Sequence, residues 1–194
     1  MVEEFVGLDD YRSLLYDVVN FEMDQAEFLG ETFYETYHPK SVIDIGCGPG
    51  VYLLPFMRHG CEVLGIDAET SLYEQFIPNN FQRVDLRLPW TPPHKFDLAL
   101  CIEVAEHLKC EFSETLVHTC AQCADRIFFT AAIPGQDGLC HYCCRPTEEW
   151  IEMFAKEGFS VSPATNSLQK QLLAKYHIGQ ACIWITRGLI FERN

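Results

Sequence analysis

The chain has 194 residues, of which 48% are hydrophobic and 13% aromatic, a composition that excludes intrinsic disorder and predicts one globular domain with a sizeable core. Its formal net charge is −14, which argues against a nucleic-acid partner and against attachment to an anionic membrane. No apolar run approaches the ~20 residues of a membrane span. The acidic start Met-Val-Glu-Glu-Phe lacks the features of a signal peptide, so we expect a cytoplasmic protein.

Helical periodicity dominates the first forty residues, and strands alternate with helices after them. Strands are expected over residues 41–45, 62–66, 81–84, 96–101, 126–133, 159–161 and 189–193. Helices are expected over residues 51–59, 71–76, 104–123, 146–156 and 166–176. This order predicts an α/β fold in a single domain 1–194, with a doubly wound, mostly parallel seven-stranded sheet over 41–194 and N-terminal helices over 1–40 as a cap.

A glycine-rich loop follows the first predicted strand, where residues 42–50 read Val-Ile-Asp-Ile-Gly-Cys-Gly-Pro-Gly. Three glycines on alternate positions allow the backbone to approach a ligand closely. Asp67 ends the second predicted strand, where an acidic side chain commonly holds a ribose diol. Because position 51 is a valine, the loop lacks the G-x-G-x-x-G pattern of dinucleotide-binding proteins.

The glycine loop and Asp67 resemble the first two motifs of class I S-adenosylmethionine-dependent methyltransferases. The resemblance implies a Rossmann-like sheet and S-adenosyl-L-methionine as cofactor. In such a site Asp67 would accept hydrogen bonds from the ribose hydroxyls, Asp85 would accept one from the adenine amino group, and Asp44 would face the methionine ammonium. The alternative is that these acids are helix caps or loop residues. The residues expected to bind the cofactor are Tyr11, Asp44, Gly46, Cys47, Gly48, Gly50, Asp67, Ala68, Asp85, Leu86 and Cys101.

The segment expected to carry the chemistry directly follows the fourth predicted strand and reads Glu-Val-Ala-Glu-His. If a helix starts there, Glu103, Glu106 and His107 share one face, at positions i, i+3 and i+4. His141 follows the neighbouring strand and could reach the same space. A sulfonium methyl is already activated, so the protein must align a nucleophile and help it lose a proton. We therefore expect Glu106, His107 and His141 to be catalytic.

The same E-x-x-E-H segment resembles two metal-using branches of the family, the ubiquinone-pathway O-methyltransferases and the small-RNA terminal 2′-O-methyltransferases. This resemblance implies that Glu103, Glu106, His107 and His141 bind a divalent cation, Mg²⁺ or Mn²⁺, with Zn²⁺ as an alternative. The ion would lower the pKa of a substrate hydroxyl. The competing hypothesis is a metal-free site in which His107 or His141 acts as a base or orients the acceptor.

The loop after the fifth predicted strand, Ile-Pro-Gly-Gln-Asp-Gly-Leu-Cys-His at 133–141, resembles that of small bacterial and viral methyltransferases with a P-G-Q-x-G-x-x-H motif. The chain departs from those proteins at Tyr142 and Cys143, where they usually carry valine and asparagine. Gln136 and His141 are expected at the substrate mouth, because a glycine-flanked loop at a strand end is a usual lid. We expect Trp150 to pack in the core.

Ten cysteines are present, and in a reducing cytosol most should be buried free thiols. Two pairs, Cys120 with Cys123 and Cys140 with Cys143, have the spacing of a four-cysteine zinc site. The strand predicted between the pairs would separate them by about 20 Å. That distance argues against zinc, whose sulfur ligands lie about 2.3 Å away.

The leading hypothesis is methyl transfer to a hydroxyl or amine of a small molecule or sugar, with a small-molecule or glycan acceptor as partner. Three alternatives remain. One is a metal-assisted RNA 2′-O-methyltransferase, although the chain shows no basic stripe. The others are a nicotinamide-binding oxidoreductase and a non-catalytic binding module on the same fold. The acceptor and the oligomeric state are left open by the sequence.

Overall fold

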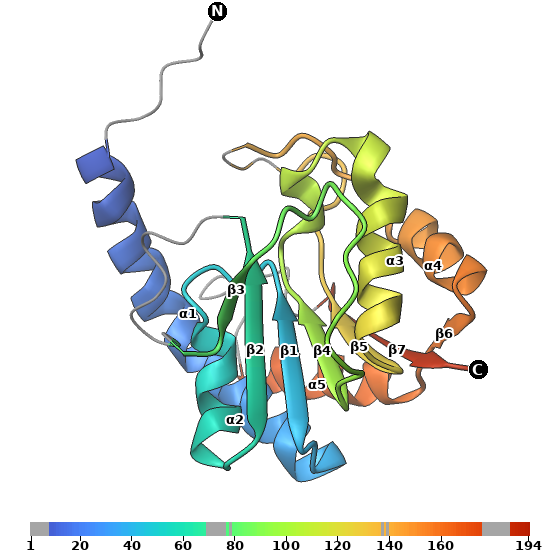
Figure 1. The fold of residues 1–194 in the computed structure, drawn as a ribbon, viewed down its shortest axis with the longest axis horizontal. Coiled ribbons are helices and arrows are strands. Elements are labelled where there is room, and N and C mark those ends of the chain that lie inside the picture. The colour runs from blue at the N-terminus through green and yellow to red at the C-terminus, as the bar shows by residue number, and fades with distance from the viewer. Residues whose placement is uncertain (1–7, 69–76, 78, 137, 139, 176–186) are drawn as a thin grey trace, which may run out of the picture.

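The computed structural model describes residues 8–68, 77, 79–136, 138, 140–175 and 187–194, and in the first helix it describes side chains from residue 23 onward. Within these residues one seven-stranded sheet has the order β3-β2-β1-β4-β5-β7-β6 (Figure 1). The strands are β1 (Ser41–Ile45), β2 (Glu62–Asp67), β3 (Phe81–Arg83), β4 (Leu98–Cys101), β5 (Arg126–Phe129), β6 (Phe159–Val161) and β7 (Leu189–Arg193). The α-helices are α1 (Leu8–Tyr37), α2 (Leu54–Arg58), α3 (Ser113–Cys123), α4 (Thr147–Lys156) and α5 (Ala164–Lys175).

The sheet is mostly parallel. Strands β1 to β5 pair in parallel, whereas β7 pairs antiparallel with both β5 and β6. All five residues of β1 are buried, as expected of a central strand covered on both faces by helices. The predicted doubly wound, Rossmann-like fold is therefore confirmed.

Two hydrophobic clusters cover the two faces of the sheet, one beneath α3 and α4 and the other beneath α1, α2 and α5 (Figure 1). Successive side chains of β5 point to opposite clusters, because side chains alternate along a strand. Phe128 meets Phe33 of α1, with ring centroids 5.1 Å apart. Phe129 meets Trp150 of α4 at 5.2 Å. Trp150 is only 3% exposed, so it packs in the core as predicted.

Several element boundaries differ from those expected. The helical region predicted over 104–123 is two short 3-10 turns, Ala105–His107 and Cys110–Phe112, followed by α3, because Leu108 and Lys109 are extended. The fifth strand ends at Phe129 rather than at residue 133. The expected helix 51–59 is a 3-10 turn, Val51–Leu53, followed by α2. One helix, α1, spans residues 8–37, where several helices were expected as a cap. The helix expected over 71–76 lies outside the described residues.

One cysteine pair departs from the expectation of free thiols. Cys110 and Cys143 form a disulfide whose Cα atoms lie 5.1 Å apart. Cys143 is therefore committed to Cys110 and is not available to a zinc site with Cys120, Cys123 and Cys140. Among the other described cysteines, six are free thiols: Cys47, Cys61, Cys101, Cys120, Cys123 and Cys140.

No helix in the described segments combines the length and the apolar character needed to cross a membrane.

Candidate active site

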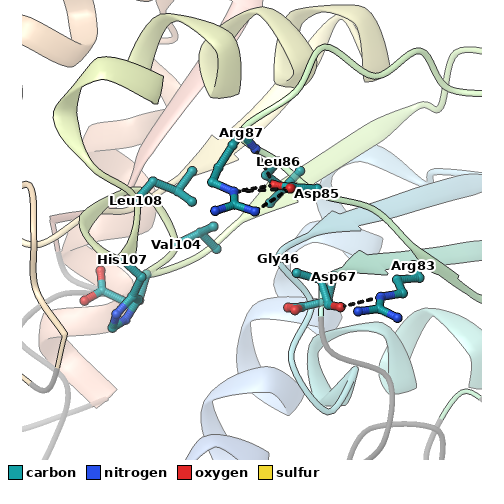
Figure 2. A pocket seen from close by; sticks show the side chains of 11 residues that line it. Gly46, Asp67, Arg83, Asp85, Leu86, Arg87, Val104, His107 and Leu108 are labelled. Carbon is teal, nitrogen blue, oxygen red and sulfur yellow. Dashed lines mark hydrogen bonds and ion pairs between the residues drawn. The ribbon is translucent and has the colours of Figure 1, made fainter. Parts of the chain in front are cut away.

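A cleft of about 540 Å³ opens at the carboxyl ends of the parallel strands (Figure 2). Its position follows from the topology: β1 lies between β2 and β4, and ligands of open α/β sheets bind where the strand order reverses. The lining residues are Gly46, Asp67, Ala68, Arg83, Asp85, Leu86, Arg87, Glu103, Val104, His107 and Leu108. Figure 2 shows His107 to the left and Asp67 to the right, with Val104 and Gly46 between them.

The glycine loop closes tightly over the end of β1. Gly46, Gly48 and Gly50 have φ of +74°, +47° and +81°, a region that other residues rarely adopt. A Cβ atom on Gly46 would lie 2.5 Å from Val104 Cγ2, so a glycine is required where the loop packs against the segment after β4. The Gly48 N–H donates to Asp67 Oδ2 at 3.0 Å, which ties the loop to the tip of β2.

Five of the residues expected to bind the cofactor line the cleft; they are Gly46, Asp67, Ala68, Asp85 and Leu86. Others lie beneath it: Asp44, Cys47 and Cys101 are 2%, 4% and 0% exposed. Burial raises the pKa of the Cys47 thiol far above its usual value. Tyr11 belongs to α1, but its side chain lies outside the described residues.

Two arginines in the cleft wall were not expected from the sequence. The Arg87 guanidinium makes a bidentate pair with Asp85 (Figure 2). Nε donates to Oδ1 at 2.8 Å, and Nη2 donates to Oδ2 at 2.7 Å. Hydrogen bonds from Arg87 lower the pKa of Asp85 to about 2. Arg83 Nε donates to the Ala68 carbonyl at 2.9 Å. The only sequence signal for this pair is its position on either side of Asp85.

The segment after β4 does not form the helical face predicted for Glu103, Glu106 and His107. Glu103 has φ +53°, so it is not helical, and the 3-10 turn begins only at Ala105. The Glu103 N–H instead donates to Thr130 Oγ1 at 2.9 Å, which anchors the segment to the end of β5. A non-glycine residue at positive φ often marks a functional site, because the surrounding structure must hold its strain.

Glu106, His107 and His141 nevertheless come together through the tertiary structure. Each offers a ligand atom, and these atoms lie within 4.8 Å of one another. Glu106 is fully buried, and its Oε1 accepts a hydrogen bond from the Ala132 N–H at 3.2 Å. Glu106 lies behind the histidines and is not among the residues that line the cleft. Glu103, expected as a fourth ligand, is not in this group; its Oε2 lies 3.5 Å from Gln136 Nε2, which donates to it.

His107 and His141, the histidine pair, are both held by backbone carbonyls. His107 Nδ1 lies 3.3 Å from the Cys140 oxygen, and His141 Nδ1 lies 3.1 Å from the Gln136 oxygen. A carbonyl can only accept, so each Nδ1 donates a proton to its carbonyl. In the tautomer with its proton on Nδ1 alone, the lone pair is on Nε2, which can then accept a proton or bind a cation.

Two carboxylate oxygens beside the cleft are buried without a hydrogen bond to the described residues. Glu103 Oε1 and Glu106 Oε2 are buried and have no hydrogen-bond partner among the described residues. Burial, and after it the charge of Glu106, raises the pKa of Glu103 to about 8. Oxygens of this kind favour a proton or a cation as neighbour.

The comparisons with known proteins decide the family. A family model described as a methyltransferase domain matches residues 26–157. The chain belongs to the methyltransferase domain family. The predicted resemblance to methyltransferases is thereby confirmed at the level of the family.

Within this family, curated relatives match one part of the chain. The ubiquinone biosynthesis O-methyltransferase of Azoarcus sp. (strain BH72) is 35% identical over 94 residues, which are 44% of this chain and 40% of that protein. The protein of the same name from Coxiella burnetii (strain RSA 493 / Nine Mile phase I) is 31% identical over 81 residues, 38% of this chain and 35% of that protein. The chain thus matches well under half the length of these relatives.

Solved structures of methyltransferases share the fold over nearly the whole chain. The structure of an amino pentose methyltransferase from Micromonospora echinaspora with bound S-adenosylmethionine has a TM-score of 0.68 at 13% identity, and the match covers 99% of this chain and 100% of that one. The magnesium protoporphyrin IX methyltransferase of Synechocystis PCC 6803, with bound S-adenosylhomocysteine, has a TM-score of 0.62 at 16% identity and covers 99% and 90%. Both likenesses describe the fold alone.

Proposed function

We propose that this protein transfers a methyl group from S-adenosylmethionine to a hydroxyl group of a small molecule and releases S-adenosylhomocysteine. One observation carries the proposal: a single cleft is bordered at one end by the glycine loop and Asp67 and at the other by His107. The names of the curated relatives, ubiquinone biosynthesis O-methyltransferases, favour oxygen over nitrogen as the acceptor atom. Amine and sugar acceptors remain alternatives.

The cofactor would occupy the wall formed by β1, β2 and β3. Asp67, at the tip of β2, would accept hydrogen bonds from the ribose hydroxyls, and the Leu86 backbone would lie beside the adenine ring. Asp85 would accept a hydrogen bond from the adenine amino group, which would replace its pairing with Arg87. Buried Asp44 would supply negative charge beneath the methionine ammonium.

The histidine pair would supply the base. The sulfonium of the bound cofactor supplies an electrophilic methyl group, so the acceptor needs alignment and the loss of one proton. His107 lines the cleft, and its Nε2 has the lone pair that such a proton transfer requires. His141 lies against His107 and would orient the same proton.

A metal-assisted version of the reaction is the second candidate, because the donor set fits a divalent cation. Glu106, His107 and His141 combine one carboxylate with two imidazoles, and both imidazoles are oriented by backbone carbonyls in the manner of metal ligands. The uncompensated Glu106 Oε2 is a further feature that a cation would satisfy. A bound ion would lower the pKa of an acceptor hydroxyl.

Calorimetric titration with S-adenosylhomocysteine tests the proposal directly. We expect saturable binding of the nucleoside and none of NAD, and transfer of a labelled methyl group to members of a panel of phenols, sugars and amines. A protein that binds NAD instead is an oxidoreductase. One that binds the nucleoside but methylates no member of a broad panel is better described as a binding module.

Titration with Mn²⁺ alone separates the two versions of the site. In the metal-assisted version, Mn²⁺ binds the wild type, and Glu106→Gln weakens that binding while leaving nucleoside binding unchanged. In the metal-free version, Mn²⁺ does not bind measurably and turnover survives chelators. An RNA acceptor would contradict the expectation from the net charge of −14, and short RNA oligonucleotides in the acceptor panel test it.

A further inference from the structure

The disulfide between Cys110 and Cys143 lies next to the histidine pair. Cys110 comes three residues after His107, and Cys143 comes two residues after His141. The bond thus joins the segment that carries Glu106 and His107 to the segment that carries His141. No other covalent bond joins these two segments in the described chain.

Hydrogen bonds also join the segment that carries Glu106 and His107 to the segment that carries His141. The Glu106 carbonyl accepts from the N–H of Tyr142 at 2.7 Å and from the N–H of Cys143 at 3.1 Å. The Cys140 carbonyl accepts from His107 Nδ1 at 3.3 Å. Further contacts join the same two segments: Arg145 Nη2 donates to the Cys110 carbonyl at 3.2 Å, and the His107 and His141 rings meet. Each of these non-covalent contacts is of modest strength, and the disulfide adds a covalent link to them.

The two cysteines differ in exposure, and exposure decides which sulfur an external thiol can attack. Cys110 is exposed, whereas Cys143 is 1% exposed. Ser113 Oγ lies 3.9 Å from Cys143 Sγ and accepts a hydrogen bond from Arg145 Nε at 3.1 Å. The Arg145 guanidinium, which also pairs with Glu149, is thus linked to Cys143 through the Ser113 hydroxyl. An external thiol therefore meets the exposed Cys110 first, and Cys143 is the sulfur that leaves.

We propose that the Cys110–Cys143 disulfide is a redox-controlled positioning device that holds His141 against His107. When the bond is intact, the histidine pair is aligned; when it is reduced, the segment that carries His141 separates from Glu106 and the pair loses its contact. The proposal rests on the proposed function, because it concerns the pair that would accept the acceptor's proton.

The chemistry requires an external dithiol. A thiolate of the dithiol attacks the exposed Cys110 sulfur, the Cys110–Cys143 bond breaks, and Cys143 leaves as a thiolate that takes up a proton. The second thiol of the dithiol then attacks the mixed disulfide and releases Cys110. Two electrons and two protons pass to the protein, and the dithiol becomes a disulfide.

The test compares oxidised and dithiothreitol-reduced wild type, full chain, by NMR and by amide hydrogen exchange. Peptide mapping without reductant first establishes the linked Cys110–Cys143 peptide; finding both cysteines alkylated as free thiols overturns the proposal. In the oxidised protein we expect a nuclear Overhauser contact between the rings of His107 and His141. On reduction we expect that contact to disappear and the amides of Tyr142 and Cys143 to exchange at least about tenfold faster, with both effects reversed by reoxidation.

Two cysteine variants and the binding of S-adenosylhomocysteine provide the controls for this experiment. Cys110→Ser/Cys143→Ser without reductant should behave like the reduced protein, and Cys61→Ser, a remote free thiol that donates to the Pro39 carbonyl, should behave like wild type. S-adenosylhomocysteine affinity should be the same in both redox states. An unchanged ring contact and unchanged amide exchange after reduction would overturn the proposal, as would general unfolding with loss of nucleoside binding. If no nucleoside binds in either state but the ring contact still follows the redox state, the proposed function fails and the positioning role stands.

Discussion

The rings of His107 and His141 meet edge to face, with centroids 5.1 Å apart and planes inclined at 76°. His107 belongs to the turn after β4 and His141 to the loop after β5, so the contact depends on the parallel pairing of these two strands. The contact brings two imidazoles together next to the buried carboxylate of Glu106, and one of them, His107, lines the cleft.

Removing the charge of Asp67 should weaken nucleoside binding. Asp67→Asn keeps an oxygen for the Gly48 N–H but loses the charged acceptor for the ribose hydroxyls. We expect the affinity for S-adenosylhomocysteine, measured by calorimetry, to fall by about 10- to 100-fold, the value of one charged hydrogen bond. Glu114→Gln is the control, because that side chain is 76% exposed and its carboxylate pairs with Lys156 on the surface, away from the cleft. Equal affinities of the two variants would rule out a ribose contact at Asp67.

Two glycines of the same loop should respond differently to alanine. Gly46→Ala places a Cβ atom 2.5 Å from Val104 in addition to straining a φ of +74°, whereas Gly48→Ala strains a φ of +47° with nothing within 4 Å. The strain alone costs about 1–2 kcal/mol, so urea unfolding should show both variants destabilised and Gly46→Ala more so. Adding Val104→Ala should recover part of the loss for Gly46→Ala and none of it for Gly48→Ala. Equal losses in the two single variants would show that the Val104 contact is unimportant.

The buried carboxyl of Glu103 should make stability fall as pH rises. Its pKa is raised from an ordinary 4.5 to about 8, chiefly by burial, so between these values the folded protein holds a proton that the unfolded chain has released. The contribution is most favourable below pH 4.5 and is lost progressively up to about pH 8. We therefore expect the free energy of unfolding of wild type to fall between pH 5 and pH 8 relative to that of Glu103→Gln. In urea unfolding the difference should grow by at most about 1.4 kcal/mol per pH unit.

The control for this pH series is Glu114→Gln, whose carboxylate is exposed. Its stability should run parallel to that of wild type across the range. A Glu103→Gln variant that also runs parallel to wild type would show that the Glu103 carboxyl ionises normally in the folded protein.

The position of the His141 ring should depend on Gly138. A Cβ atom there would lie 2.2 Å from His141 Nε2, so Gly138→Ala must push the ring aside. We expect loss of the His107–His141 ring contact in NMR spectra and unchanged nucleoside affinity. Methyl transfer should fall by about tenfold, less than the roughly 10²–10⁴-fold of a lost general base, because His107 stays in place. Gly135→Ala is a matched control, since it strains a φ of +84° in the same loop with nothing within 4 Å. If both variants keep the ring contact, Gly138 does not set the position of His141.

Local patterns in the sequence were enough to predict the frame of the site. The apolar runs of β1 and β2, the glycines between Gly46 and Gly50, and Asp67 are close together in the chain, and each follows a rule of strand or loop geometry. Their arrangement at the carboxyl ends of parallel strands follows from alternation of strands and helices. The segment after β4 was predicted less well, because the spacing of Glu103, Glu106 and His107 suggests a helix, whereas Glu103 has a positive φ and the turn begins only at Ala105.

By itself, then, the sequence determined the fold class, the family resemblance and which end of the sheet would hold the cleft, because periodicity and turn chemistry are local. Only the tertiary structure decided that Arg87 binds Asp85, that Cys110 bonds to Cys143, and that His141 meets His107. The last two join loops that are distant in sequence. Their alignment depends on strand pairing and on backbone conformations such as the positive φ of Glu103 and Cys140, which no local pattern specifies.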